Sequence, residues 1–345
     1  MTDKSPIPKT IAEFAERARE LIPEAVHAYF ATGSGDELTL RANDSAWTRH
    51  ALRQRVVVGV EDRSSKVTLL GTDCSFPLIV APTAWQTLAH PEGELATAHA
   101  AGTLGIPMCL STWSGLPLED VASAAPNTSL WFQTQFLVDR SLTDELIDRA
   151  VESGYKAVVL TLDQPVASRR DRSMRLNFTR PQSPNLQGAK VALDPSVRWE
   201  DVVALVERLD IPVLAKGIID PRDAELAVES GCAAVIVSNH GGRQLDGTLP
   251  TATALPQVAD VVAGRVPVMV DGGIRRGTDV AKALALGADA AMIGRPIVWA
   301  LAVGGEAGVR SMLELIAEEF EIALALMGVR SPSELGRDNI VDAPW

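Results

Sequence analysis

The chain has 345 residues, of which 46% are hydrophobic, and its 32 basic and 44 acidic residues give a net charge of -12. The apolar content is typical of a globular protein with a large core, and the length suits two ordinary domains or one α/β barrel. The acidic balance argues against nucleic acid or an anionic membrane as partner, but clustered arginines could still bind a small anion.

The amino terminus and the cysteines bear on where the protein works. The start of the chain, MTDKSP, lacks an apolar targeting core, and no apolar run is long enough to span a bilayer. We therefore expect a soluble, cytoplasmic protein with no membrane partner. Cys74, Cys109 and Cys232 are odd in number and lack metal-site spacing, which predicts reduced, buried thiols and no bound metal.

The first predicted element is a helical pattern from Thr10 to Phe30, followed by a loop at 32–35. Residues 1–77 are expected to form an amino-terminal helical cap, with no Pro- or Ser-rich linker after it. Eight apolar, β-rich runs follow and predict strands. They lie at 78–81, 106–110, 130–135, 157–162, 211–215, 233–237, 266–270 and 288–293.

Amphipathic helices are predicted between these strands, for example at 144–153, 221–230 and 278–286, each closely followed by a glycine. Strands that are nearly all apolar and alternate with helices predict a (β/α)8 TIM barrel over 78–330, within a single domain of 1–345. A doubly wound open sheet is the competing α/β fold. Polar groups follow every strand, which favours the barrel, because an open sheet gathers its ligands at one crevice.

A long connection follows the fourth strand. Residues 166–197 are rich in Arg, Pro, Asn, Gln and Ser, and the next helix is expected near Ser196. Structureless connections of this length are uncommon in compact domains and often act as lids. We expect a lid, with a disordered insertion as the alternative.

The last two strands end in glycines and arginines. The segment DGGIRRG at 271–277 follows the seventh strand, and Gly294-Arg295-Pro296 follows the eighth. Glycines let backbone N–H groups approach a phosphate, arginines neutralise it, and barrels commonly hold phosphates at these two loops. The residues therefore predict a phosphorylated ligand, either a sugar phosphate or flavin mononucleotide (FMN).

The most informative stretch is SNHGGRQLDG at 238–247, directly after the sixth strand. It places a titratable base, His240, and a fixed cation, Arg243, on one loop at the carboxyl end of a strand. Oxidation of a carbinol beside a carboxylate needs such a base and a guanidinium fork for the anion. A solvated turn is the alternative, since Gly-Gly is common in turns.

These residues resemble the signature of the FMN-dependent 2-hydroxy acid oxidases and dehydrogenases, the family of glycolate oxidase, lactate oxidase and mandelate dehydrogenase. The resemblance runs from Tyr29 to about Gly328. It implies FMN as cofactor and three catalytic residues: His240 as base, Asp163 as its partner, and Lys216 beside the flavin N1 and C2 carbonyl. A neighbouring carboxylate is expected to raise the pKa of the imidazole.

The resemblance also assigns residues that contact the cofactor and the substrate. Besides Lys216, the expected cofactor-binding residues are Pro82, Thr83, Ala84, Ser111, Gln133, Thr161, Ser238, Asp271, Gly272, Gly273, Arg275, Gly294 and Arg295. The expected substrate-binding residues are Tyr29, Arg170, Arg243, Gln135, Trp113 and Trp85. Arg169 and Arg172 are expected to be solvated, and His27, His50, His90 and His99 to be structural.

Two residues depart from the family pattern. Gln135 stands where the family usually has a tyrosine whose hydroxyl bonds the substrate oxygen, and an amide differs from a phenol in reach, acidity and shape. Trp85 stands near the flavin where a smaller or flexible residue is more usual, and it could occlude or reshape the pocket. Both bear on which substrate is accepted.

The resemblance implies oxidation of a small 2-hydroxy acid to the 2-oxo acid: a proton goes to His240, a hydride equivalent goes to flavin N5, and dioxygen reoxidises the flavin and gives H2O2. A dehydrogenase with another acceptor and an oxidase of an atypical substrate are the alternatives within the enzyme class. A flavin-binding protein without turnover is an alternative outside it, which the joint presence of His240, Asp163 and Arg170 disfavours. The family commonly forms tetramers, so a homotetramer is expected.

Overall fold

The computed structural model describes residues 7–186, 188–189 and 191–345. Eight short parallel strands form its centre: β4 (Leu78–Val80), β5 (Met108–Ser111), β6 (Leu130–Thr134), β7 (Val158–Thr161), β8 (Val213–Ile218), β9 (Ala234–Val237), β10 (Val268–Val270) and β11 (Ala290–Ile293). They close into a barrel in the order β10-β11-β4-β5-β6-β7-β8-β9. The predicted (β/α)8 barrel is therefore confirmed, with all eight strands where the apolar runs lie.

Successive side chains of each strand point to opposite faces, which separates two apolar cores. Ile79 and Ala81 pack inside the barrel, together with Trp131 of β6. Leu78 and Val80 point outward into the larger core between strands and helices. Because both faces are buried, the strands can be apolar throughout, which is why they read as unbroken runs in the sequence.

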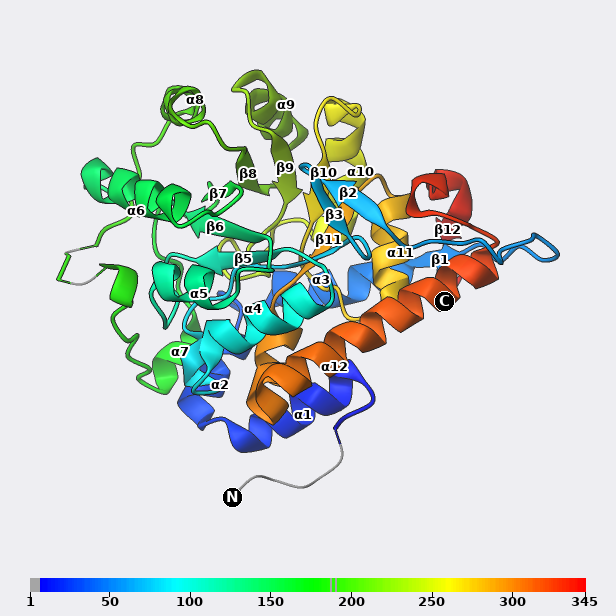
Figure 1. Ribbon diagram of the computed structural model, residues 1–345, viewed down its shortest axis with the longest axis horizontal. Coiled ribbons are helices and arrows are strands. Elements are labelled where there is room, and N and C mark those ends of the chain that lie inside the picture. Colours follow the sequence, from blue (N-terminus) through cyan, green and yellow to red (C-terminus); the bar gives the residue numbers. More distant parts are fainter. Residues whose placement is uncertain (1–6, 187, 190) are drawn as a thin grey trace.

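The outer layer consists of helices that follow the strands. They are α4 (Gly93–Thr103), α5 (Leu118–Ala124), α6 (Arg140–Glu152), α8 (Trp199–Arg208), α9 (Pro221–Glu229), α10 (Thr251–Val262), α11 (Gly277–Ala285) and α12 (Arg295–Met327). Figure 1 shows α12 running beside α4 along the outside of the barrel. It is bent where Gly304 and Gly305 leave helical geometry. None of the helices in the described ranges is long and apolar enough to cross a membrane.

The amino-terminal segment contains three helices, α1 (Ile11–Leu21), α2 (Glu24–Ala31) and α3 (Leu38–Ala46). The predicted continuous helix from Thr10 to Phe30 is wrong in one respect: it breaks at Ile22 and Pro23, which are extended between α1 and α2. Proline lacks the N–H for an interior helical bond but is well tolerated where a helix begins. The break turns α2 toward the barrel, where its carboxyl end meets the candidate site.

Two small antiparallel pairs complete the fold. Strands β2 (Val67–Leu69) and β3 (Thr72–Cys74) form a hairpin whose Leu69 and Cys74 join the core inside the barrel. Since Cys74 comes just before β4, the hairpin lies at the amino-terminal end of the barrel strands and closes that end. Strand β1 (His50–Leu52) pairs with β12 (Ile340–Asp342), near the end of the chain. The three cysteines are free and buried, as predicted.

The long connection after β7 is more structured than its composition indicated. It contains a short helix, α7 (Asp171–Arg175), and a 3₁₀ turn at Pro184–Leu186, and α8 begins at Trp199 rather than near Ser196. Buried Ser183 donates to the carbonyl of Thr112 at 2.9 Å, and Asn185 accepts a bond from the backbone N–H of Leu118. These contacts hold the connection against the segment that follows β5.

Candidate active site

A cavity of about 520 Å³ lies at the carboxyl ends of the barrel strands, where barrels carry their catalytic loops. Nearly all of the site residues expected from the sequence line it: Tyr29, Pro82, Thr83, Ala84, Trp85, Ser111, Trp113, Gln133, Gln135, Thr161, Arg170, Lys216, His240, Arg243, Asp271, Gly272, Gly273, Arg275, Gly294 and Arg295. Asp163 and Ser238 lie behind this lining, in contact with His240 and Lys216. The other four histidines do not line the cavity.

The histidine and the aspartate proposed as its partner are in contact. His240 Nδ1 lies 3.1 Å from Asp163 Oδ1, so a proton on Nδ1 is held there and Nε2 is left as the basic nitrogen. His240 has a φ of 58°, in the left-handed region that non-glycine residues seldom adopt. Backbone strain of this kind is concentrated at functional sites, where surrounding contacts hold the residue in place.

Burial decides the net direction of the His240 pKa, although Asp163 raises it as expected. Burial lowers the pKa of His240 below its usual value of 6.5, and this outweighs the opposing effect of Asp163. Lys216 and Arg170 lower it further, because positive charges disfavour a second cation nearby. Burial alone would raise the pKa of Asp163, but its interaction with His240, together with the charge of Lys216, holds the pKa of this carboxyl below its usual range. At neutral pH the site therefore presents a neutral imidazole beside an ionised carboxylate.

Lys216 is buried and doubly bound. Its Nζ lies 2.9 Å from Asp271 Oδ2 and donates to Ser238 Oγ at 2.7 Å. Despite burial, Asp271 and Asp163 raise the pKa of Lys216, so the ammonium stays charged. The predicted end of this strand is corrected: β8 continues beyond Lys216 to Ile218 through an irregularity in its pairing with β9.

Gln133 connects three strand ends. It accepts a hydrogen bond from Ser111 Oγ at 2.9 Å, and its Nε2 donates to Thr161 Oγ1 and to Gln135 Oε1, both at 3.0 Å. Because Gln135 Oε1 accepts the hydrogen bond from Gln133, Gln135 Nε2 takes no part in this contact. Gln135 Nε2 is buried and has no partner among the described residues.

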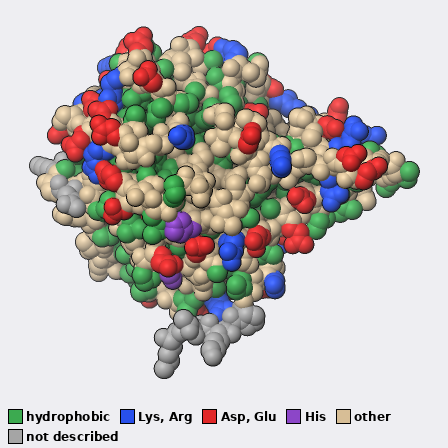
Figure 2. All heavy atoms as spheres, viewed as in Figure 1, with side chains coloured by type: hydrophobic (Ala, Val, Ile, Leu, Met, Phe, Trp, Pro, Cys, Tyr) green, Lys and Arg blue, Asp and Glu red, His purple; other side chains and the backbone are tan. Residues whose placement is uncertain are grey.

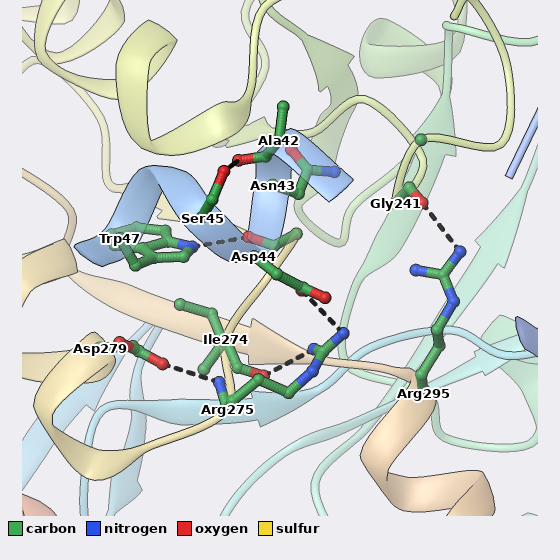
Figure 3. Close-up of polar contacts among 12 residues, drawn as sticks. Ala42, Asn43, Asp44, Ser45, Trp47, Gly241, Ile274, Arg275, Asp279 and Arg295 are labelled. Atoms are coloured by element: carbon green, nitrogen blue, oxygen red, sulfur yellow. Dashed lines mark hydrogen bonds and ion pairs between the residues drawn. The ribbon is translucent and has the colours of Figure 1, made fainter. Parts of the chain in front are cut away.

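The glycine and arginine loops that follow β10 and β11 line the same cavity. Arg275 Nη2 lies 3.0 Å from Asp44 Oδ1, and its backbone N–H donates to Asp279 Oδ2 at 2.9 Å, as Figure 3 shows. Arg295 Nη2 donates to the carbonyl of Gly241 at 2.8 Å. Gly273 has a φ of 82°, and a Cβ there would lie only 2.1 Å from the carbonyl oxygen of Asn43. Only glycine fits this close approach.

The residues present fit an FMN molecule. Two arginines and the Gly272-Gly273 backbone at one end suit its phosphate, which carries close to two negative charges near neutral pH. Asp271 Oδ1 is buried and has no partner among the described residues, as expected of an acceptor that awaits ligand hydroxyls. Lys216 contributes a positive charge to the same cavity that Gln133 and Ser111 line with amide and hydroxyl groups.

The substrate end is formed by arginines and aromatic rings. Arg243 Nη1 donates to the carbonyls of Tyr29, Phe30 and Thr32, at and just beyond the carboxyl end of α2. Arg170 Nε donates to Ser168 Oγ at 3.3 Å. Burial, reinforced by Arg243, lowers the pKa of Arg170 to about 9, so this guanidinium is still charged at neutral pH.

Trp85 forms one wall of the cavity. Its ring lies 5.6 Å from the Tyr29 ring and 5.7 Å from the Trp113 ring, between centroids. Tyr29 stacks in turn on Phe178 from the long connection, at 4.8 Å. Trp85 adopts a left-handed φ of 50°, and its buried indole N–H has no acceptor among the described residues. Trp85 thus lines the cavity together with Tyr29 and Trp113 and does not fill it.

Three residues near the site were not singled out from the sequence. Asn43 and Asn239 exchange two hydrogen bonds of 2.8 Å, and Arg180 lines the cavity beside Arg170 and Arg243. No local pattern could have joined Asn43 to Asn239, which is far away in the chain. Arg180 is one of several arginines in the long connection after β7, and only its position in the cavity lining distinguishes it from the others. Arg169 and Arg172 are exposed and pair with Asp171 and Glu37, consistent with solvated roles.

Known proteins are similar to this chain over nearly its whole length. The family described as FMN-dependent dehydrogenase matches residues 18–342. Glycolate oxidase 3 of Arabidopsis thaliana is 41% identical over 350 residues, which cover 96% of this chain and 95% of that protein. A peroxisomal (S)-2-hydroxy-acid oxidase of Oryza sativa subsp. japonica is 44% identical over 353 residues, which cover 97% and 96%.

Solved structures of mandelate oxidase are similar over the same length. One has a TM-score of 0.92 at 39% sequence identity and covers 97% of this chain and 98% of its own. Another, with (S)-4-hydroxymandelic acid, has a TM-score of 0.93 at 38% identity and covers 97% and 99%. Since the family match spans most of the chain and the relatives are well above 30% identical, the chain belongs to the FMN-dependent dehydrogenase family and is an FMN-dependent oxidoreductase.

Proposed function

We propose that this protein oxidises a small 2-hydroxy acid to the 2-oxo acid. The observation that carries the proposal is the His240–Asp163 contact of 3.1 Å, in a cavity that also contains Arg243 and Arg170. A base for the hydroxyl or carbinol proton and a cationic site for a carboxylate are the two requirements of this chemistry. Relatives named glycolate oxidase, (S)-2-hydroxy-acid oxidase and mandelate oxidase support the same substrate class.

In the proposed mechanism the substrate carboxylate binds Arg243 and Arg170, with Tyr29 beside it. Arg243 is held by three backbone carbonyls, so its remaining donors face the cavity in a fixed orientation. Neutral His240 takes the proton at Nε2, and Asp163 stabilises the imidazolium that results. FMN, held at its phosphate by Arg275, Arg295 and the Gly272-Gly273 backbone, would supply the two-electron oxidation and the reduction of dioxygen to H2O2.

Lys216 acts electrostatically in this proposal. Its buried ammonium faces the cavity and is kept charged by Asp271 and Asp163. A fixed positive charge in a site of low dielectric stabilises negative charge that develops during the reaction. Gln133, Ser111 and Thr161 form a rigid amide and hydroxyl cluster that would orient the cofactor ring.

Anaerobic reduction tests the proposal directly. The purified FMN-loaded protein is mixed with glycolate, lactate, mandelate and larger aryl acids, and the flavin absorbance is followed. Bleaching by at least one acid supports the reaction, and a spectrum that stays oxidised with all of them contradicts it. Oxygen uptake and H2O2 formation during turnover then separate an oxidase from a dehydrogenase that uses another acceptor.

A second candidate is an oxidase of an atypical substrate, and Gln135 favours it. The unpartnered Nε2 of Gln135 is a donor without the acidity of a phenol, so it suits an acceptor on the ligand.

The residues of 166–197 that line the cavity, such as Val166, Arg170 and Leu193, support a role of this segment as a lid. Three further predictions concern the whole protein: a cytoplasmic location, a single domain and a homotetramer. Measurement of the molecular mass in solution tests the homotetramer.

A further inference from the structure

The cavity is strongly positive although the whole chain is acidic. Among its described lining residues, Arg170, Arg180, Lys216, Arg243, Arg275 and Arg295 are cationic, and Asp271 is the single carboxylate. On the face drawn in Figure 2, acidic and basic side chains are instead interspersed. A concentration of one sign of charge in a concave site favours ligands of the opposite sign.

Some of these cationic side chains are already matched by a negatively charged partner. Lys216 pairs with Asp271 at 2.9 Å and Arg275 with Asp44 at 3.0 Å, and Arg295 is assigned to the cofactor phosphate. Three guanidinium groups remain at the substrate end: Arg170, Arg180 and Arg243. No carboxylate of the described residues lies within 4.0 Å of any of them, whereas Arg169 and Arg172 of the same connection each have one. A single substrate carboxylate would leave this group with excess positive charge.

Arg180 is close enough to the other two to affect them. Its charge contributes to lowering the pKa of both Arg170 and Arg243, although burial is the larger cause in each. Arg180 itself is exposed, at the mouth of the cavity, two residues after Phe178, whose ring stacks on Tyr29. Arg180 is thus more exposed to solvent than Arg170 and Arg243.

Two further donors of the cavity lack acceptors. Gln135 Nε2 and Trp85 Nε1 are both buried without a partner among the described residues. A purely alkyl or aryl side chain on the substrate would leave both N–H groups unpaired, and each unpaired buried donor weakens binding. A substrate side chain that ends in oxygen atoms would provide acceptors and balance the charge of Arg180.

We propose that the preferred substrate is a 2-hydroxy acid with a second carboxylate at the end of its side chain, and that Arg180 binds this second carboxylate. The inference rests on the proposed oxidation of 2-hydroxy acids and adds the chemistry of the side chain. Arg170 and Arg243 then hold the carboxylate next to the reacting carbon, and Arg180 sets the specificity at the far end.

Matched substrate pairs test this inference in the FMN-loaded enzyme. Racemic malate is compared with 2-hydroxybutyrate, and racemic 2-hydroxyglutarate with 2-hydroxyvalerate, by flavin reduction and by kcat/KM. We expect at least one diacid to be favoured over its matched monoacid by about tenfold or more, as a charge-assisted hydrogen bond allows. Mandelate is included as the aryl alternative.

Variants assign the preference to Arg180. R180M is expected to remove most of the preference for the diacid, through a higher KM, and R180K to retain part of it. R175M is the matched control, because Arg175 is exposed on α7 of the same connection but does not line the cavity. Flavin absorbance and thermal unfolding of each variant verify that the site is intact.

The outcomes separate the two proposals. If monoacids or mandelate reduce the flavin as well as or better than every diacid, the inference is overturned and the oxidation of 2-hydroxy acids stands. If R180M lowers kcat/KM equally for both members of a pair, Arg180 has no specific role and the inference also fails. If no 2-hydroxy acid reduces the flavin, both proposals fall.

Discussion

Asn43 and Asn239 donate to and accept from each other across two 2.8 Å hydrogen bonds, although 196 residues separate them in the chain. Both are buried, and Asn239 immediately precedes His240. Asn239 Oδ1 also accepts a bond from the backbone N–H of Gly242 at 3.1 Å. Helix α3 therefore fixes the loop that carries the proposed base.

The first prediction concerns this pair. Asn43→Ala removes both hydrogen bonds to Asn239, whose amide keeps only its contacts with Gly242 and Leu249, and this should lower the free energy of unfolding by about 1–3 kcal/mol. Loss of the loop's position should also lower kcat/KM by about tenfold, since small displacements of a base are costly. Urea denaturation and steady-state kinetics measure the two effects. Ser45→Ala on the same helix is the control, because its hydroxyl is exposed; equal effects from both variants would contradict a role for the pair.

Removal of the base gives the second prediction. His240→Ala should abolish bleaching of the flavin by any active 2-hydroxy acid, because no other neutral base of the described residues lies at this point of the cavity. FMN binding should persist, since the phosphate end and Lys216 are unchanged. Anaerobic stopped-flow absorbance and the flavin content of the purified variant check both statements. Bleaching at the normal rate would show that His240 is not the base.

The third prediction is a pH profile. Because burial lowers the pKa of His240 below 6.5, the base stays neutral down to that range, and kcat/KM should fall only as pH drops below about 6.5. Asp163→Asn removes a charge that raises this pKa, so the acid limb should move to lower pH. The plateau should fall by about 10²-fold or more, because the imidazolium loses its partner. An acid limb above pH 6.5, or a shift to higher pH in the variant, would refute the assignment.

Lys216 provides the fourth prediction. Lys216→Met leaves the buried Asp271 carboxylate without its ion pair, which should destabilise the fold by about 3–5 kcal/mol. The double variant Lys216→Met/Asp271→Asn should recover much of this stability, because no unpaired charge remains. It should not recover the rate of flavin reduction, which we expect to be about 10²–10³-fold below normal. Recovery of rate together with stability would mean that Lys216 is only structural.

The fifth prediction tests the phosphate end. Arg275→Gln should weaken FMN binding by about 10–100-fold, the size of one lost charge-assisted hydrogen bond. Arg276→Gln is a matched control, because the neighbouring Arg276 is half exposed and pairs with Glu319 at 2.8 Å. Equilibrium dialysis with fluorescence detection of free FMN measures both constants. Similar weakening in the two variants would argue against a specific phosphate contact by Arg275.

The sequence predicts the barrel well because its information is local. Each strand is a short apolar run, and glycines such as Gly154, Gly231 and Gly287 mark the ends of the helices before the strands. The sequence also predicts that the polar groups after the strands lie together, because the strands of a closed parallel barrel all have their carboxyl ends on one side.

Features that depend on distant segments could not be predicted in this way. The Asn43–Asn239 pair links two ordinary-looking residues, and Pro23 can equally end one helix or begin another. The direction of the His240 pKa depends on how much of the ring is buried, which outweighs its visible neighbour Asp163. Arg180 became distinct from nearby arginines only through the cavity that it lines.

The carbonyls at the carboxyl end of α2 hold both Arg243 and Arg295, since Phe30 accepts a bond from each of them. The amino-terminal segment is thus a wall of the reaction chamber and not an accessory to the barrel. Removing the amino-terminal segment to obtain a smaller catalyst would release the guanidinium groups of both Arg243 and Arg295. The eight-stranded barrel could still form, but Arg243 and Arg295 would lack the backbone carbonyls that hold them.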